Sequence, residues 1–146
     1  MIASMLAKRK VRSVFDTMSQ DDFDVNAVVA SMTDDSAYDI PSDLGVGETV
    51  KGKKAIAEWL QRWKKEYPKR KFDVKSICYS AWPLCPTNVC TVNWTFTQTN
   101  KEGKEFRYDG VSVFLFRNFK MTRGSDYISF VGLPRLSTLI KPSGKA

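Results

Sequence analysis

The sequence of 146 residues contains no histidine, and this restricts the chemistry that its side chains can perform. Without an imidazole there is no Ser–His or Cys–His nucleophile pair and no histidine ligand for a metal. Proton transfer near neutral pH would have to use Asp, Glu, Tyr, Lys or Cys with a shifted pKa. A carboxylate enclosed by aromatic side chains is suited to this, because the loss of solvation raises its pKa.

The three cysteines, Cys78, Cys85 and Cys90, offer little alternative chemistry. They form no CxxC pair, and their number is odd. We interpret them as reduced thiols on or near a hairpin. The sequence therefore predicts neither a metal site nor a cofactor.

The net charge of +7 comes from a single segment, residues 51–71, which holds nine Lys or Arg and two Glu. Trp and Tyr interleave with these charges, a composition that nucleic-acid-binding segments also have. However, the aromatic residues lie on the apolar stripe of a predicted helix, where no base could stack. We interpret the segment as a solvated helix face, which makes nucleic acid an unfavoured partner and leaves only weak attraction of anionic partners.

The length of the chain suits one domain, residues 1–146, without disulfides or metals. No apolar run approaches the roughly 20 residues that span a bilayer. Near the start a few apolar residues precede a basic cluster, which is the reverse of the order in a secretory signal. We therefore expect a cytoplasmic protein that does not associate with membranes.

Helical periodicity predicts three helices in the first half of the chain. The first runs from Ser4 to about Ser19, and the second follows the acidic residues 21–24 and ends at 33–35. The third begins at Gly52, carries an apolar stripe that includes Trp59 and Trp63, and is stopped by Pro68. Between the last two helices, residues 36–40 read as a short strand and residues 42–50 as a loop.

After Pro68 the period changes from helical to two, which predicts strands at 71–82, 88–99, 104–116 and 121–130. Residues 100–103 read as a hairpin turn between the second and third of these strands. Helices followed by hairpins indicate an α+β fold with an antiparallel sheet.

Several short motifs follow one another along the chain: DDFD at 21–24, MTDD at 32–35, GKKAI at 52–56, FRYDGV at 106–111, FKM at 119–121 and DY at 126–127. Their order resembles that of the SnoaL-like and nuclear transport factor two-like superfamily, which includes ketosteroid isomerases, polyketide cyclases and limonene epoxide hydrolases. The resemblance covers about 5–136 and leaves a short C-terminal tail. It implies a cone-shaped, curved antiparallel sheet wrapped around three N-terminal helices, with an open-ended pocket.

The resemblance does not extend to most of the catalytic residues of two of these enzyme types. Ketosteroid isomerases use a Tyr on the first helix and two Asp on strands, and the matching positions here hold Val14, Ile40 and Ser112. The acid–base Asp of the polyketide cyclases falls at Ser129. Steroid isomerisation and ring-closing aldol chemistry by those mechanisms are therefore not expected.

The epoxide hydrolase pattern is retained in part. Its Asp in a last-strand Asp-Tyr corresponds to Asp126. Its Arg and Asp on the long middle strand are replaced by Asn93 and Thr95, and Asp39 stands where an Asn would hold water. We take Asp126 as the best catalytic candidate, against the alternative that it caps a backbone amide or pairs with Arg123.

Asp39 is a second catalytic candidate if it faces the pocket, because one of two close carboxylates would then hold a proton. The alternative is that Asp39 faces solvent near a strand end. The side chains that we expect to contact a ligand are Trp59, Trp63, Asn93, Thr95, Tyr108, Ser112 and Phe114. Trp59 and Trp63 would otherwise be ordinary core residues.

Polar and apolar residues alternate along 88–99, with Asn93 and Thr95 on one face and Val92, Trp94 and Phe96 on the other. The resemblance places the polar set inside the cone, which leaves the apolar set exposed on the convex sheet. Exposed apolar patches usually mark partner surfaces, so a homodimer through Val92, Trp94 and Phe96 is expected. The alternative is that the faces are reversed and the apolar set is core.

Two functions from different classes remain open. The first is an acid–base enzyme of the isomerase, cyclase or hydrolase type that acts on a small, mostly apolar ligand in the pocket. The second is a non-catalytic, dimeric module for ligand binding or assembly, which the missing catalytic residues suggest.

Overall fold

The computed structural model describes residues 2–41, 48–80 and 87–129. The helices in these ranges are α1 (Ile2–Met18), α2 (Val25–Val29) and α3 (Lys53–Glu66). The strands are β1 (Met32–Ile40), β2 (Glu48–Lys51), β3 (Lys69–Tyr79), β4 (Thr87–Thr99), β5 (Glu105–Arg117) and β6 (Lys120–Ser129). None of the helices in this part of the chain combines the length and the apolar character that crossing a bilayer requires.

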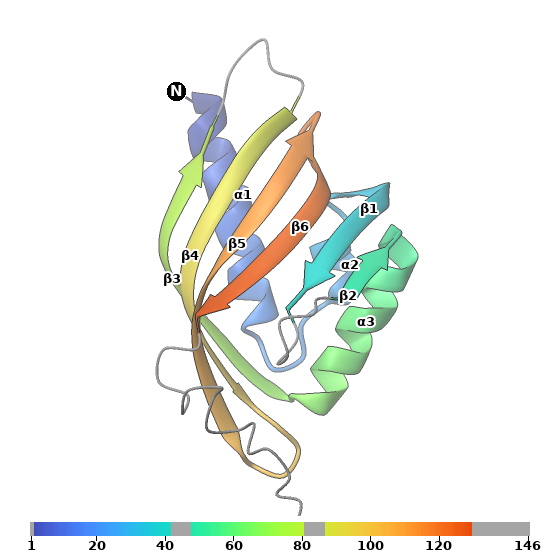
Figure 1. Cartoon of the computed structure of the whole chain (residues 1–146), viewed down its shortest axis with the longest axis vertical. Helices are drawn as coiled ribbons and strands as arrows, with labels where there is room; N and C mark the ends of the chain where they lie inside the picture. The colour runs from blue at the N-terminus through green and yellow to red at the C-terminus, as the bar shows by residue number, and fades with distance from the viewer. Residues whose placement is uncertain (1, 42–47, 81–86, 130–146) are drawn as a thin grey trace, which may run out of the picture.

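The strands form one curved, unclosed sheet in the order β2-β1-β6-β5-β4-β3 (Figure 1). β3 to β6 form an antiparallel meander, whereas β1 lies parallel to β6. The sheet is therefore mixed rather than wholly antiparallel. This topology places Tyr38 on β1 directly opposite Gly124 on β6, although the two residues are far apart in the sequence.

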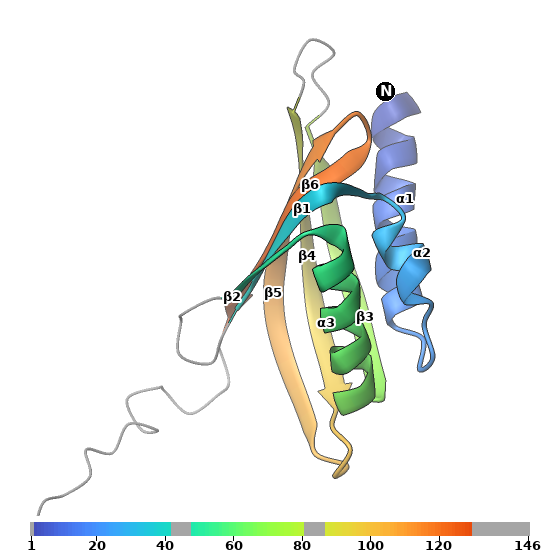
Figure 2. The same cartoon turned by 90° about the vertical axis from the view of Figure 1, so that its right-hand side faces the viewer.

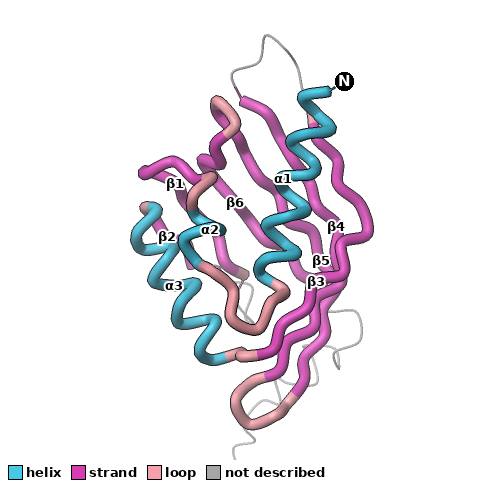
Figure 3. Tube along the Cα trace, turned by 180° about the vertical axis from the view of Figure 1, so that it is seen from behind, coloured by secondary structure: helices cyan, strands magenta, loops and turns pink. Residues whose placement is uncertain are grey.

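All three helices lie on one side of the sheet (Figures 2 and 3). Val11 and Phe15 on α1, and Ile56 and Leu60 on α3, are buried against it at a spacing of four residues. α1 packs against β3, and α3 packs against β1 and β2. We call this side the helix-covered face, and the opposite side, over which the described residues place no helix, the outer face.

The predicted α+β fold, a curved sheet wrapped around three helices, is confirmed. Two boundaries differ from the prediction: the second helix ends at Val29, and residues 33–35 belong to β1. Long-range pairing explains the difference, because the Met121 N–H donates to the Ser31 carbonyl at 2.8 Å and so draws this segment into the sheet. Residues 48–51, predicted as a loop, form β2 by pairing with β1.

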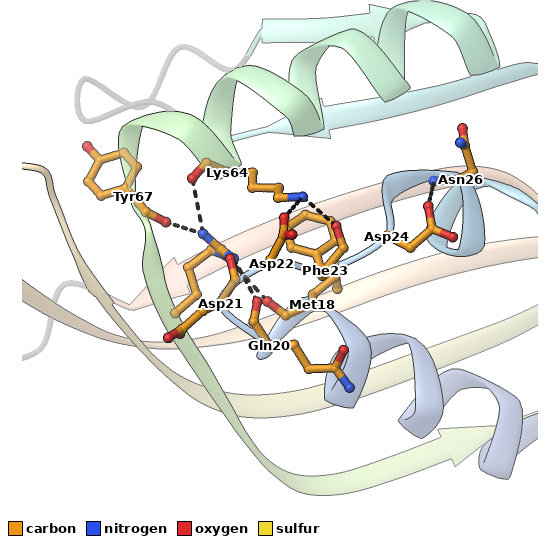
Figure 4. A network of polar contacts seen from close by, with 10 residues as sticks. Met18, Gln20, Asp21, Asp22, Phe23, Asp24, Asn26, Lys64 and Tyr67 are labelled. Carbon is orange, nitrogen blue, oxygen red and sulfur yellow. Dashed lines mark hydrogen bonds and ion pairs between the residues drawn. The ribbon is translucent and has the colours of Figure 1, made fainter.

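The buried side chain of Arg70 connects the turn after α1 to the end of α3. Its guanidinium donates hydrogen bonds to the carbonyl oxygens of Met18, Gln20, Asp21, Lys64 and Tyr67 (Figure 4). It also lies over the rings of Phe23 and Trp63, 4.9 and 5.3 Å from their centroids. Because a buried charge is tolerated only when it is satisfied, this network holds α3 in one position against the sheet.

Candidate functional site

A cavity of about 250 Å³ lies between the helix-covered face of the sheet and the helices α1 and α3. It exceeds the cavity of roughly 150 Å³ that accommodates benzene in an engineered protein. Most of its wall is apolar or aromatic. Among the described residues that line it, Asp126 is the only carboxylate and Lys10 the only cationic side chain.

Aromatic rings from α3 and β4 form one part of this wall. Trp59 and Trp63, four residues apart on α3, stack with their centroids 5.8 Å apart and their planes within 14°. Trp63 also contacts Phe96, with centroids 5.8 Å apart, and its indole N–H donates to Gln98 Oε1 at 3.1 Å. These contacts, together with Arg70 over Trp63, fix the orientation of the rings that face the cavity.

Asp126 on β6 lines the cavity, and both of its carboxylate oxygens accept hydrogen bonds. Ser112, directly opposite on β5, donates to Oδ1 at 2.5 Å, and the Tyr38 hydroxyl from β1 donates to Oδ2 at 3.0 Å. The Trp94 indole N–H donates in turn to Ser112 Oγ at 2.8 Å. Because an indole can only donate, Ser112 accepts from Trp94 and directs its own proton to Asp126.

Burial raises the pKa of Asp126 to about 6, because the ionised carboxylate is poorly solvated among these side chains. The hydrogen bonds from Ser112 and Tyr38 act in the opposite direction, since they favour the ionised form, but burial outweighs them. Burial, and then the negative charge of Asp126, raise the pKa of Tyr38 well above its ordinary value. At neutral pH the site is therefore mainly a carboxylate held by two protonated hydroxyl groups.

This arrangement leaves Asp126 able to exchange a proton with a molecule in the cavity. Each carboxylate oxygen can accept two hydrogen bonds, and the contacts from Ser112 and Tyr38 occupy one site on each oxygen. A pKa of about 6 lies near the working pH, where a general acid or base is most effective.

Asp39 does not line the cavity with Asp126, so of the two alternatives for Asp39 the structure shows the one in which it faces away from the pocket. Asp39 alternates with Tyr38 along β1 and lies on the outer face, where Arg123 donates to both its oxygens at 2.9 Å. The hydroxyl groups of Ser125 and Thr49 also donate hydrogen bonds to the Asp39 carboxylate, at 2.7 Å each. The bond from Ser125, followed by those from Thr49 and Arg123, lowers the pKa of Asp39, which fits a structural anion rather than a base.

The faces of β4 are the reverse of those expected from the resemblance. Val92, Trp94 and Phe96 are 0%, 3% and 7% exposed and belong to the core, so they do not form a convex dimer surface. Asn93 and Thr95 lie on the outer face, where the Thr95 hydroxyl donates to Asp109 at 2.6 Å. The physical reason is that burial of the large apolar set stabilises the fold. Of the polar pair, Asn93 is exposed, whereas Thr95 is only 9% exposed and has its hydroxyl satisfied by Asp109.

The other residues expected to contact a ligand do line the cavity. These are Trp59, Trp63, Tyr108, Ser112 and Phe114. Sequence reasoning missed Tyr38, Trp94 and Gln98, which line it as well. The alternative in which the apolar face of β4 is core would have placed Trp94 inside. No local signal shows that Tyr38 reaches Asp126, since β1 and β6 pair only in the folded chain.

The basic segment 51–71 does not present an aromatic surface to solvent. Trp59 and Trp63 line the cavity, and Arg70 is buried. The two tryptophans of the segment are therefore directed towards the cavity rather than towards a base in solution, in agreement with the interpretation as a solvated helix face.

The sequence model of the SnoaL-like domain family matches residues 11–124 of the chain. No curated protein matches it in sequence. Among solved structures, a provisionally named aromatic ring hydroxylase from Novosphingobium aromaticivorans is 17% identical, with 88% of this chain and 90% of that chain covered and a TM-score of 0.75.

Two further solved structures have a similar fold. An NTF2-like protein from Burkholderia pseudomallei is 17% identical over 84% of this chain and 90% of its own, with a TM-score of 0.68. A protein with a ketosteroid isomerase-like fold from Catenulispora acidiphila, in complex with trimethylamine, is 16% identical over 83% of this chain and 85% of its own, with a TM-score of 0.65. At these identities the similarity concerns the fold alone.

Proposed function

Because the chain belongs to the SnoaL-like domain family, we propose that its cavity binds a small, mostly apolar molecule and that Asp126 transfers a proton on that molecule. One observation carries this proposal: a carboxylate with a pKa raised to about 6 lines a cavity whose wall is otherwise mostly apolar. Apolar walls with a few convergent polar groups are typical of small-molecule sites.

In the proposed reaction the ionised Asp126 accepts a proton from a C–H or O–H group of the ligand, and the protonated Asp126 returns it to another atom. The ligand keeps its composition, as in an isomerisation or a ring closure. Ser112 and Tyr38 hold the carboxylate during both steps, and Tyr38 remains protonated. The rings of Trp59 and Trp63 would contact the apolar part of the ligand.

The positions of the polar residues favour this proton transfer over hydrolysis of the epoxide hydrolase type. That pattern requires polar partners on the middle strand and a group that holds water. Here Asn93 and Thr95 lie on the outer face, and Asp39 is bound to Arg123 on the same face. Asp126 is thus the only acid–base group of the hydrolase pattern that lines the cavity.

A screen of small aromatic and alicyclic carbonyl compounds tests the proposal. Binding would be followed by the melting temperature and by tryptophan fluorescence, since Trp59, Trp63 and Trp94 line the cavity. Proton transfer would be followed by NMR as exchange of ligand C–H for deuterium in D₂O. We expect an exchange rate that rises with pH to a plateau, with a midpoint near 6.

Asp126→Asn is the control, because it keeps the shape of the side chain and removes its basicity. We expect this variant to bind the same compounds and to lose roughly 10²- to 10⁴-fold in exchange rate. Full activity in Asp126→Asn, or a rate that does not change between pH 4 and pH 8, would exclude Asp126 as the acid–base group. If no compound raises the melting temperature, a small-molecule site of this kind is not supported.

A second candidate function is assembly through the outer face. Apolar side chains form a patch there, which we call the outer patch: Val89, Val111, Val113, Leu115 and Tyr127. Tyr127 is 63% exposed and Val89 is 37% exposed. Exposed apolar patches usually mark partner surfaces, and we propose that the homodimer forms here rather than through Val92, Trp94 and Phe96.

The charges beside the outer patch suit a symmetric partner. Arg107 and Asp109 precede Val111 on the same face of β5, and both are exposed. In a two-fold arrangement the same patch meets itself, so Arg107 of one copy can approach Asp109 of the other. Analytical ultracentrifugation at micromolar concentration checks this: a dimer is expected, and a monomer would remove the proposal.

A further inference from the structure

Two glycines of the central strands lie directly opposite large aromatic residues. Gly124 on β6 pairs with Tyr38 on β1, and Gly110 on β5 pairs with Trp94 on β4. Glycine weakens the interior of a strand, and within a strand it often marks a place where another group approaches the backbone closely. Both glycines fall next to the Asp126 site rather than at a strand end.

At each of these positions a side chain larger than that of glycine would clash with the aromatic ring opposite. A Cβ atom at Gly124 would lie 2.7 and 2.8 Å from Cε2 and Cδ2 of Tyr38, and 3.1 Å from Cδ1 of Phe114. A Cβ atom at Gly110 would lie 2.5 Å from Cη2 of Trp94 and 2.7 Å from the carbonyl oxygen of Tyr127. Real Cβ atoms essentially never come closer than 3.0 Å to such atoms, so both rings cross the strand where the glycine has no side chain.

Each ring extends over the glycine opposite it, and its polar end reaches the residue two positions after that glycine on the neighbouring strand. Tyr38 passes Gly124 and its hydroxyl reaches Asp126, whereas Trp94 passes Gly110 and its indole N–H reaches Ser112. Residues two apart on a strand share a face, and Ser112 and Asp126 are directly opposite each other. The two pairs therefore approach the same carboxylate from opposite sides.

We propose that Gly124 and Gly110 are positioning residues: they give the Tyr38 and Trp94 rings room to cross the strands, so that Tyr38 binds the Asp126 carboxylate directly and Trp94 holds it through Ser112. Neither glycine is among the described residues that line the cavity, and each acts through an aromatic neighbour. The inference rests on the proposed function only for its consequence in catalysis. The test of this positioning role needs no ligand. The positioning role can therefore be wrong while the cavity binds small molecules, and it can be right while the cavity binds none.

The test uses the ¹³C NMR titration of the Asp126 carboxyl carbon in Gly124→Ala, Tyr38→Phe and the double variant. Tyr38→Phe removes only the hydroxyl, and we expect the Asp126 midpoint to rise by about one pH unit, because one hydrogen bond to the charged form is lost. Gly124→Ala displaces the ring and should raise the midpoint in the same direction. The double variant should show no further rise beyond Tyr38→Phe.

Gly103→Ala provides a matched control. Gly103 lies in the turn between β4 and β5, has a φ of +82°, and has nothing within 4 Å of the position of a Cβ atom. This substitution strains the turn and should leave the Asp126 midpoint unchanged. If Gly124→Ala also leaves the midpoint unchanged, or adds fully to Tyr38→Phe, the positioning role is wrong.

A second pair of variants applies if Gly124→Ala does not fold. Tyr38→Ala removes the ring that the new methyl group would meet most closely. In Tyr38→Ala/Gly124→Ala the remaining close neighbour is Phe114 Cδ1 at 3.1 Å, a contact that a shift of a few tenths of an ångström relieves. We expect this double variant to fold and to titrate with the same Asp126 midpoint as Tyr38→Ala. A midpoint that differs between these two variants would show that Gly124 acts other than through Tyr38 and would overturn the proposal.

Discussion

Asp126→Asn is expected to change how the stability of the fold depends on pH. The pKa of Asp126 is about 6 in the folded protein, against about 3.9 in an unfolded chain. Between these values the folded state binds more protons than the unfolded state. The free energy of unfolding of the wild type therefore decreases, through this group, as the pH rises from about 4 to about 6.

The magnitude follows from the difference between the two pKa values. One pKa unit corresponds to about 1.4 kcal/mol, so ionised Asp126 lowers the free energy of unfolding by on the order of 3 kcal/mol at pH 7. Asn carries no charge and avoids this penalty. Its amide group cannot accept one of the two hydroxyl donors, Ser112 or Tyr38, and this loses about 1 kcal/mol at any pH.

Asp126→Asn should thus be about 1 kcal/mol less stable than the wild type at pH 4 and about 2 kcal/mol more stable at pH 7. Urea denaturation followed by circular dichroism, at intervals from pH 4 to pH 8, measures this difference. A difference between the two proteins that stays constant across this range would refute the reasoning, because it would mean that Asp126 titrates normally.

Asp39→Asn is the matched control and should show the opposite sign. Hydrogen bonds from Ser125, Thr49 and Arg123 lower the pKa of Asp39 in the folded protein. Its stabilising contribution is therefore present above the unfolded pKa of about 3.9 and is lost as the pH falls below it. Asp39→Asn should be less stable than the wild type at pH 7, and this difference should become smaller towards pH 3.

Three further results are expected. Arg70→Met should lower the free energy of unfolding by about 3 kcal/mol, because five carbonyl groups lose their donor; a loss below about 1 kcal/mol in urea denaturation would contradict the network. Ser112→Ala should raise the midpoint of Asp126 in a ¹³C NMR titration, since the Ser112 hydroxyl favours the ionised form; an unchanged or lower midpoint would show that this bond is unimportant. Tyr127→Lys should keep the far-UV circular dichroism spectrum and convert the proposed dimer to a monomer, and a dimer that survives would place the interface elsewhere.

Helices and strands with strong local periodicity could be predicted from the sequence. The apolar stripe of α3 and the alternation along β4 predict a helix and a strand within a few residues of those observed. β2 and the first residues of β1 were not predictable in this way. β2 is a strand because it pairs with Ala37–Ile40 of β1, and β1 begins at Met32 because this residue pairs with Met121. Such long-range pairing leaves no periodic signal in a short segment.

The candidate site was predictable in part, and for the same reason. Asp126 and Ser112 were identified as pocket residues, and both line the cavity. Their partner Tyr38 was not identified, because the bond from Tyr38 to Asp126 joins residues 88 positions apart and depends on the parallel pairing of β1 with β6.

The error on β4 has a different cause. Alternation alone shows two faces, and burial of the larger apolar set would have placed Trp94 and Phe96 inside, as observed. The resemblance favoured the opposite assignment. The position of Asp39 also follows from the alternation of side chains along a strand. Its neighbour Tyr38 faces the cavity, so Asp39 faces outwards.

The most direct test of the account is a ¹³C NMR titration of the Asp126 carboxyl carbon in the wild-type protein. The structure places this carboxylate in an aromatic cavity with Ser112 and Tyr38 as its donors, and predicts a midpoint of about 6. A midpoint at or below the ordinary value of about 4 would show a solvated carboxylate and would contradict a buried acid–base site.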